Sequence, residues 1–136
     1  MHFKYLEVED VEDLHDMAVE LYGGLPGRVI GKLVAKLALP MSGFGEYNRF
    51  PSIYEKAAVY HYELASGHAF IDGNKRTSYL SAFTFLDWNG FDLIASDEEV
   101  YNWTKALADD KKRPPFEEAV QWIITHAISR KISYFQ

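Results

Sequence analysis

Residues 74–89 carry apolar side chains on nearly every face of the helix that their spacing predicts. The apolar positions are Tyr79, Leu80, Ala82, Phe83, Phe85, Leu86 and Trp88. A helix that is apolar all round is stable only where other elements cover it, so this segment predicts a buried central helix. Gly90 follows at the position of a left-handed C-terminal cap.

Amphipathic segments separated by turn residues account for most of the remaining chain. We expect further helices over about 8–22, 26–39, 52–65, 96–108 and 115–130, with each boundary placed to within about two to four residues. The apolar/polar alternation of half-buried strands is almost absent. The sequence therefore predicts an all-α, compact bundle of about six helices.

Several side chains give these helices specific ends and a specific core. Ser52 is an expected N-cap, and Ser96 with Glu99 forms a capping-box pattern. In the second helix, the residues expected to point inward are Val29, Ile30, Leu33, Val34 and Leu37. The three tryptophans are expected in the core: Trp88, Trp103 and Trp122. Residues 41–50, which hold two glycines and three aromatic residues, are expected to form an exposed loop, the candidate flap.

The composition limits the number of domains and the kinds of partner. With 48% hydrophobic residues in 136, the chain has material for one core, so we expect a single domain over residues 1–136. A formal net charge of -6 is the reverse of the basic surface that nucleic-acid binders carry, so no direct nucleic-acid partner is expected. Because the chain has no cysteine, no signal-like start and no membrane-length apolar run, we expect a cytoplasmic protein without membrane contact.

The stretch from His68 to Arg76, between two expected helices, concentrates chemically active side chains. A helix N-terminus attracts phosphate through its unpaired N–H groups, and Gly73 would let the backbone approach such a ligand closely. Asn74, Lys75 and Arg76 lie in the first turn, where cations oppose the helix dipole unless an anion binds them. This stretch therefore predicts a polyphosphate site.

The same stretch supplies candidates for a metal ligand and a general base. Asp72 is placed to hold Mg²⁺ that arrives with a nucleotide, since Mg²⁺ is commonly bound by one or two carboxylates together with substrate phosphates. His68 can accept a proton from an incoming hydroxyl near neutral pH. Phe70 is expected to anchor the loop in the core. Each residue taken singly would be an ordinary surface or capping residue, and only the cluster predicts a site.

Residues 68–76 resemble the signature of the Fic/Doc superfamily, in which His-x-Phe-x-(Asp/Glu)-Gly-Asn precedes a basic pair or Gly-Arg. The form with Lys75 before Arg76 is similar to the death-on-curing (Doc) toxin branch, and the resemblance extends over about residues 53–90. The chain departs from that pattern at Ala69, where relatives usually have Pro, and at Gly67, where many have Asn. The resemblance implies the compact all-helical Fic fold.

The resemblance also implies an activity, which is modification of a Ser or Thr hydroxyl on a target protein with ATP and Mg²⁺. His68 would be the catalytic base, Asp72 the Mg²⁺ ligand, and Asn74, Lys75 and Arg76 the phosphate-binding groups, with Gly73 giving backbone access. In Fic enzymes that transfer AMP, a Gly occupies the position of Lys75, so the lysine favours phosphoryl transfer, as in Doc, where the target is a translation elongation factor. A small antitoxin with a disordered segment is the implied partner.

Two alternatives remain open at the level of sequence. Transfer of AMP or another nucleotide moiety would use the same residues and differs only in the meaning of Lys75. A catalytically inactive helical interaction module is the second alternative, and the intact set of chemical side chains argues against it. A histidine metal site formed by His61 and His68 is disfavoured, because the break at Gly67 separates the two.

Overall fold

The computed structural model describes residues 2–29 and 31–131. These residues form six α-helices, one short 3₁₀ helix and two small antiparallel sheets of two strands each. The helices are α1 (Val8–Tyr22), α2 (Lys32–Ala38), η1 (Leu39–Met41), α3 (Ile53–Ser66), α4 (Asn74–Trp88), α5 (Asp97–Leu107) and α6 (Phe116–His126). The strands are β1 (Gly43–Phe44), β2 (Tyr47–Asn48), β3 (Phe91–Leu93) and β4 (Ala127–Ser129). The expected all-α bundle is confirmed.

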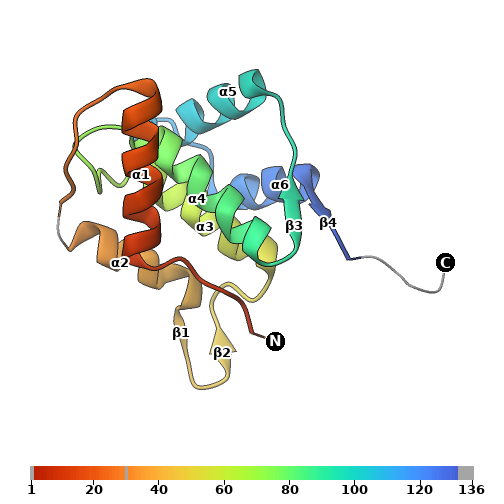
Figure 1. The fold of residues 1–136 in the computed structure, drawn as a ribbon. Helices are drawn as coiled ribbons and strands as arrows, with labels where there is room; N and C mark the ends of the chain where they lie inside the picture. The colour runs from red at the N-terminus through yellow and green to blue at the C-terminus, as the bar shows by residue number, and fades with distance from the viewer. Residues whose placement is uncertain (1, 30, 132–136) are drawn as a thin grey trace.

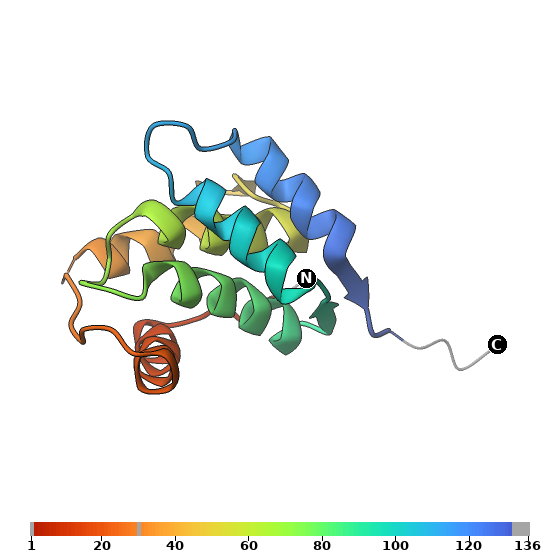
Figure 2. The same cartoon turned by 90° about the horizontal axis from the view of Figure 1, so that it is seen from above.

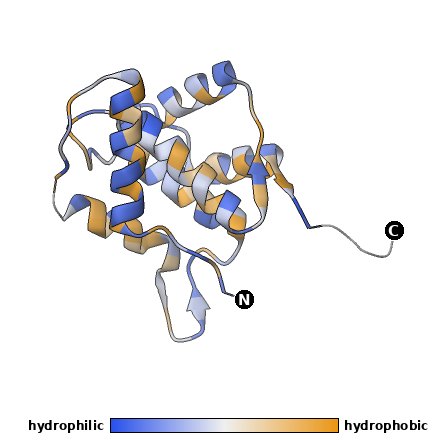
Figure 3. Ribbon diagram, in the orientation of Figure 1, coloured by the Kyte–Doolittle hydropathy of each residue, from blue (hydrophilic) through white to orange (hydrophobic). Residues whose placement is uncertain are grey.

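Helices α3 and α4 pack side by side at the centre of the bundle (Figure 1). Helix α1 lies on one side of α4, whereas α5 and α6 lie on the other side (Figure 2). Tyr60 of α3 and Phe85 of α4 meet in the core with ring centroids 5.1 Å apart. The side of α1 that faces away from α4 is largely hydrophilic (Figure 3). The order of layers places the start of α4 beside the end of α1.

The expected capping signals determine where two helices begin. Oγ of Ser52 accepts a hydrogen bond from the backbone N–H of Glu55, and the Glu55 carboxylate accepts one from the Ser52 N–H. Ser96 and Glu99 form the same reciprocal pair at the start of α5. Gly90 has φ of 87°, which is the left-handed conformation expected after α4. These predictions from sequence are confirmed.

The prediction of a helix over residues 26–39 is wrong in its first half. Residues 23–29 are not helical, and α2 begins at Lys32. The backbone N–H of Val29 donates to Ala69 O, and Ile71 N–H donates to Gly27 O, so this segment pairs with the loop after α3. Main-chain pairing therefore replaces the expected helical hydrogen bonds. Of the expected inward residues, Val34 is exposed, and Ile30 lies outside the described residues.

Three further predictions need correction. The last helix ends at His126 rather than near residue 130, because the chain turns there into β4 and pairs with β3. Trp88 is 40% exposed at the end of α4 and is not a core residue. Within residues 41–50, strands β1 and β2 form an antiparallel hairpin, which projects from the body of the fold (Figure 1).

No helix within the described part of the chain combines the length and the apolar character needed to cross a bilayer.

Candidate functional site

The loop that joins α3 to α4, residues 67–73, and the first turn of α4 carry the predicted site residues, and we call the loop the signature loop. Its second residue is His68, whose φ of 51° is the only positive value among the described non-glycine residues. A histidine in the left-handed region is uncommon, and such strain clusters at functional sites. The His68 side chain is 64% exposed, so its imidazole is accessible to a substrate.

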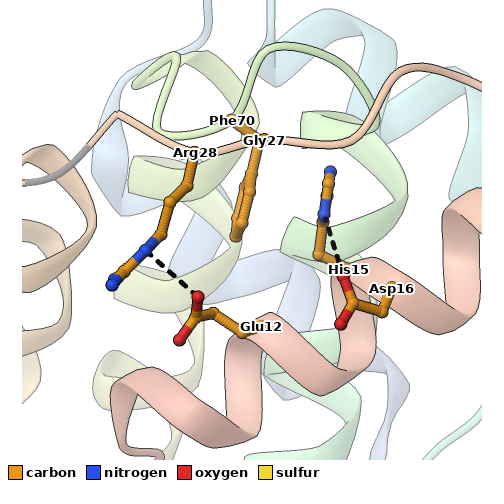
Figure 4. Close-up of a pocket in the computed structure, with 6 residues that line it drawn as sticks. All are labelled: Glu12, His15, Asp16, Gly27, Arg28 and Phe70. Atoms are coloured by element: carbon orange, nitrogen blue, oxygen red, sulfur yellow. Dashed lines mark ion pairs between the residues drawn. The ribbon is translucent and has the colours of Figure 1, made fainter.

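Phe70 fixes the middle of the signature loop in the core. Its side chain is buried, and its ring stacks on the imidazole of His15 in α1, with centroids 3.9 Å apart and planes 8° apart. Figure 4 shows Phe70 between Arg28 and His15, above α1. Arg28 is held in turn by an ion pair of 3.1 Å with Glu12. The aromatic side chain therefore anchors a loop whose polar residues on either side remain accessible.

Asn74, the first residue of α4, has its side chain directed back at the signature loop. Its Oδ1 accepts a hydrogen bond of 3.0 Å from the Phe70 N–H, and its Nδ2 donates one of 2.9 Å to Phe70 O. The amide thus clamps both backbone groups of Phe70. What Asn74 can offer to an anion is its backbone N–H in the first turn of α4. The phosphate-binding role of Asn74 stays a prediction.

Asp72 presents an exposed carboxylate just before α4. Oδ1 accepts a hydrogen bond of 2.9 Å from the Gly73 N–H, and Oδ2 accepts one of 3.2 Å from the Leu25 N–H. The pKa of the Asp72 carboxyl is held below its ordinary value, most strongly by the hydrogen bond from Gly73, then by the bond from Leu25, and also by the charge of Lys75. The carboxylate is therefore anionic at neutral pH and is oriented by two segments of backbone.

Gly73 and Gly24 allow the backbone to approach this carboxylate closely. Gly73 is the N-cap of α4 and has φ of 75° in the left-handed region. A Cβ on Gly24, whose φ is 117°, would lie 3.0 Å from Oδ2 of Asp72. The run of glycines after α1 was the sequence signal that this turn contacts the site. Sequence reasoning interpreted it only as a helix stop and therefore missed the contact of Leu25 with Asp72.

Lys75 and Arg76 lie exposed in the first turn of α4, which contains no acidic residue. The guanidinium of Arg76 lies over the ring of Tyr22, 4.3 Å from its centroid. Tyr22 ends α1, and Leu25, which binds Asp72, follows three residues later. Asp72 and Arg76 therefore both contact residues 22–25, on one side of the helix start. Two cations, an oriented carboxylate and the unpaired N–H groups of a helix form a site suited to metal-bound phosphates.

His68 is contacted from a different segment. Its Nε2 lies 3.2 Å from Oδ2 of Asp110, in the loop between α5 and α6. His61, seven residues earlier, is buried in α3 and pairs through Nε2 with Thr104 Oγ1 at 2.7 Å. The two histidines therefore have different surroundings. No group of three or more His, Cys, Asp or Glu side chains within the described residues is arranged to hold a metal ion.

Comparison with known proteins agrees with this geometry. The model of the Fic/DOC family matches residues 5–86, which include α1, the signature loop and most of α4. Toxin Doc of Mycolicibacterium smegmatis is 39% identical over 92 residues, covering 68% of this chain and 69% of that protein. Protein kinase doc of Escherichia phage P1 is 34% identical over 103 residues, covering 70% of this chain and 75% of that protein. The resemblance noted in the sequence is confirmed, and the chain belongs to the Fic/DOC family.

Proposed function

We propose that this protein is the toxin of a toxin-antitoxin system and transfers the γ-phosphoryl group of ATP to a Ser or Thr hydroxyl of a target protein. The observation that carries the proposal is the start of α4, where the anionic Asp72 and the cations Lys75 and Arg76 adjoin the loop of the exposed His68. Two relatives support it by their names, one a toxin and the other a protein kinase.

The residues at the helix start fit Mg²⁺ that is brought by the nucleotide. Asp72 is exposed and anionic, and each of its oxygens accepts one backbone hydrogen bond, which leaves lone pairs for a cation. A single carboxylate is what a protein commonly contributes when substrate phosphates supply further ligands. When bound, the ion would neutralise charge on the phosphates. Lys75, Arg76 and the first N–H groups of α4 would hold the oxygens of the transferring group.

In the reaction, His68 takes the proton of the target hydroxyl while the oxygen of that hydroxyl forms a bond to the γ-phosphorus. The bond between that phosphorus and the β,γ-bridging oxygen breaks, and ADP leaves with the electron pair. Because the imidazole of His68 is exposed, a protein substrate can reach it without opening of the fold. A general base of this kind contributes about 10²- to 10⁴-fold in rate.

The identity of the transferred group is tested with ATP labelled at either the α- or the γ-phosphate. Purified protein is added to a bacterial extract, and labelled proteins are separated and identified, with a translation elongation factor as the first candidate. Label from the γ-phosphate alone supports phosphoryl transfer, which the lysine at position 75 favours. Label retained from the α-phosphate would replace this proposal by nucleotide transfer. No label from either would favour an inactive interaction module.

Two variants make the test specific to the site. His68→Ala should abolish label transfer and growth arrest while leaving the far-ultraviolet circular dichroism unchanged, because the His68 side chain is largely exposed. Lys112→Ala, at an exposed position of the α5–α6 loop, is the matched control and should retain activity. Growth arrest by folded His68→Ala protein would refute the catalytic assignment. We further propose a small antitoxin as partner, which co-expression rescue would identify.

A further inference from the structure

His15 is a buried polar residue that neither composition nor helix pattern explains. It is 2% exposed on the inner face of α1, a position where an apolar residue would serve packing equally well. Its ring is parallel to that of Phe70, and Figure 4 shows both side chains between α1 and the loop above it. A buried imidazole needs a hydrogen-bond partner, and the identity of that partner indicates what the residue does.

The partner is the backbone of the candidate metal ligand. Nε2 of His15 lies 2.7 Å from the carbonyl oxygen of Asp72, and since that oxygen can only accept, Nε2 carries the proton. The same imidazole edge faces Gly73, where an added Cβ would lie 3.4 Å from both Cδ2 and Nε2. His15 therefore holds the Asp72–Gly73 peptide, which leads directly into the N-cap of α4.

Asp72 is consequently held at three of its atoms. The carbonyl oxygen is bound by His15, while Oδ1 and Oδ2 are bound by the N–H groups of Gly73 and Leu25. Rotation of the Asp72–Gly73 peptide would break the His15 bond and would tilt both the carboxylate and the first N–H groups of α4. The bond thus couples the orientation of the carboxylate to the orientation of the anion-binding turn.

We propose that His15 is a positioning residue, which donates from Nε2 to the Asp72 carbonyl and thereby fixes the metal-binding carboxylate relative to the start of α4. This inference rests on the proposed function for its effect on rate. It requires no change in the protonation of His15 during the reaction. The His15 side chain therefore has two separable roles. Stacking on Phe70 needs only a ring, whereas the bond to the Asp72 carbonyl needs a hydrogen-bond donor.

Two substitutions separate these roles. His15→Phe keeps a ring of similar size against Phe70 but has no donor. His15→Gln loses the ring, but its side-chain N–H₂ stands the same number of bonds from Cα as Nε2 of histidine and can donate to Asp72. Met17→Ala, at an exposed position of the same helix, is the control for changes in α1. The rate of label transfer from ATP is measured for each folded variant.

We expect His15→Phe to lower the rate by about 10²-fold, the effect of a displacement near 1 Å in a catalytic group. His15→Gln should restore most of that loss, and Met17→Ala should match the wild type. A His15→Phe protein as active as the wild type would overturn the inference. So would equal losses in His15→Phe and His15→Gln, because the donor supplied by glutamine would then have restored no activity.

Nitrogen NMR of the unmodified protein gives a test that needs no variant and no activity. Protonated Nε2 on His15 is the expected result, and an unprotonated Nε2 would overturn the inference even if His15→Phe failed to fold. Amide hydrogen exchange at Leu25 and Gly73 should be faster in His15→Phe than in His15→Gln. If the wild type transfers no label, the proposed function fails, while these two measurements still decide whether His15 holds Asp72.

Discussion

The imidazole Nε2 of His68 lies 3.2 Å from the carboxylate Oδ2 of Asp110, which comes from outside the segment that the family model matches. Both side chains are largely exposed, His68 to 64% and Asp110 to 62%. Ion pairs of this kind stabilise folded proteins by about 0–1 kcal/mol. The contact can therefore orient the candidate base without adding much to stability.

Replacing Asp110 tests whether the contact affects the orientation of His68 more than it affects stability. Asp110→Asn should change the free energy of unfolding by less than about 0.5 kcal/mol, because water screens the pair. It should lower the rate of label transfer, but by less than His68→Ala does, since the base itself remains. Denaturant titration and the labelling assay measure the two effects. A loss of activity as complete as that of His68→Ala would show that Asp110 has a direct part in the chemistry.

The two adjacent glycines after α1 offer a matched pair of substitutions. Gly23 and Gly24 both have positive φ, 83° and 117°, so alanine strains the backbone at either position. Nothing lies within 4 Å of a Cβ on Gly23, whereas a Cβ on Gly24 would meet Oδ2 of Asp72 at 3.0 Å. We expect both variants to lose about 1–3 kcal/mol of stability. Only Gly24→Ala should also weaken the use of Mg²⁺. We expect it to raise the Mg²⁺ concentration that gives half the maximal rate of label transfer.

Acid should destabilise the fold through His61. Burial lowers the pKa of His61 to about 3, whereas the unfolded chain binds a proton near the ordinary value of about 6.5. Between these two values the unfolded state holds more protons, so stability is complete above about pH 6.5 and falls by about 1.4 kcal/mol per unit as the pH decreases. Denaturant unfolding at several pH values should show this slope. In His61→Phe the slope of the free energy of unfolding against pH should be smaller by about 1.4 kcal/mol per unit. An unchanged slope would contradict the assignment of this effect to His61.

Lys56 should hold the β1–β2 hairpin to the body of the protein. It is fully buried in α3, and its ammonium donates to Pro40 O at 2.9 Å and to Asn48 Oδ1 at 3.1 Å. Lys56→Met leaves the Pro40 carbonyl without this donor, so we expect a loss of about 1–3 kcal/mol. Amide exchange in the hairpin, at Arg49 for example, should become faster. Lys32→Met, at an exposed position, is the control and should change neither quantity.

The long helices could be predicted from sequence because their signals are local. Helix α1 occupies the predicted residues 8–22, and the Ser52 and Ser96 caps lie within one turn of the residues that they bind. The burial of Lys56 could not be predicted, because its two oxygen partners come from η1 and β2, which its own helix does not specify. A lysine at that spacing ordinarily predicts a solvated face.

The candidate site was predicted as a cluster of residues, but its supports were not. Residues 68–76 contain the candidate base, metal ligand and helix start, so adjacency in sequence was enough to group them. The supports come from far along the chain, since 57 residues separate His15 from Asp72 and 42 separate His68 from Asp110. The helix expected over 26–39 failed for the same reason, because its backbone pairs with the signature loop instead.

That pairing affects how the chain can vary in evolution. The bonds from Val29 to Ala69 and from Ile71 to Gly27 join main-chain atoms, which every residue other than proline supplies in the same form. Amino-acid identity at Val29 and Ile71 can therefore drift in homologues while the two segments stay aligned, whereas Gly27, with φ of 116°, favours glycine. Inserting or deleting a single residue in either segment would shift the alignment and withdraw Leu25 from the Asp72 carboxylate, so spacing is the property that selection must preserve here.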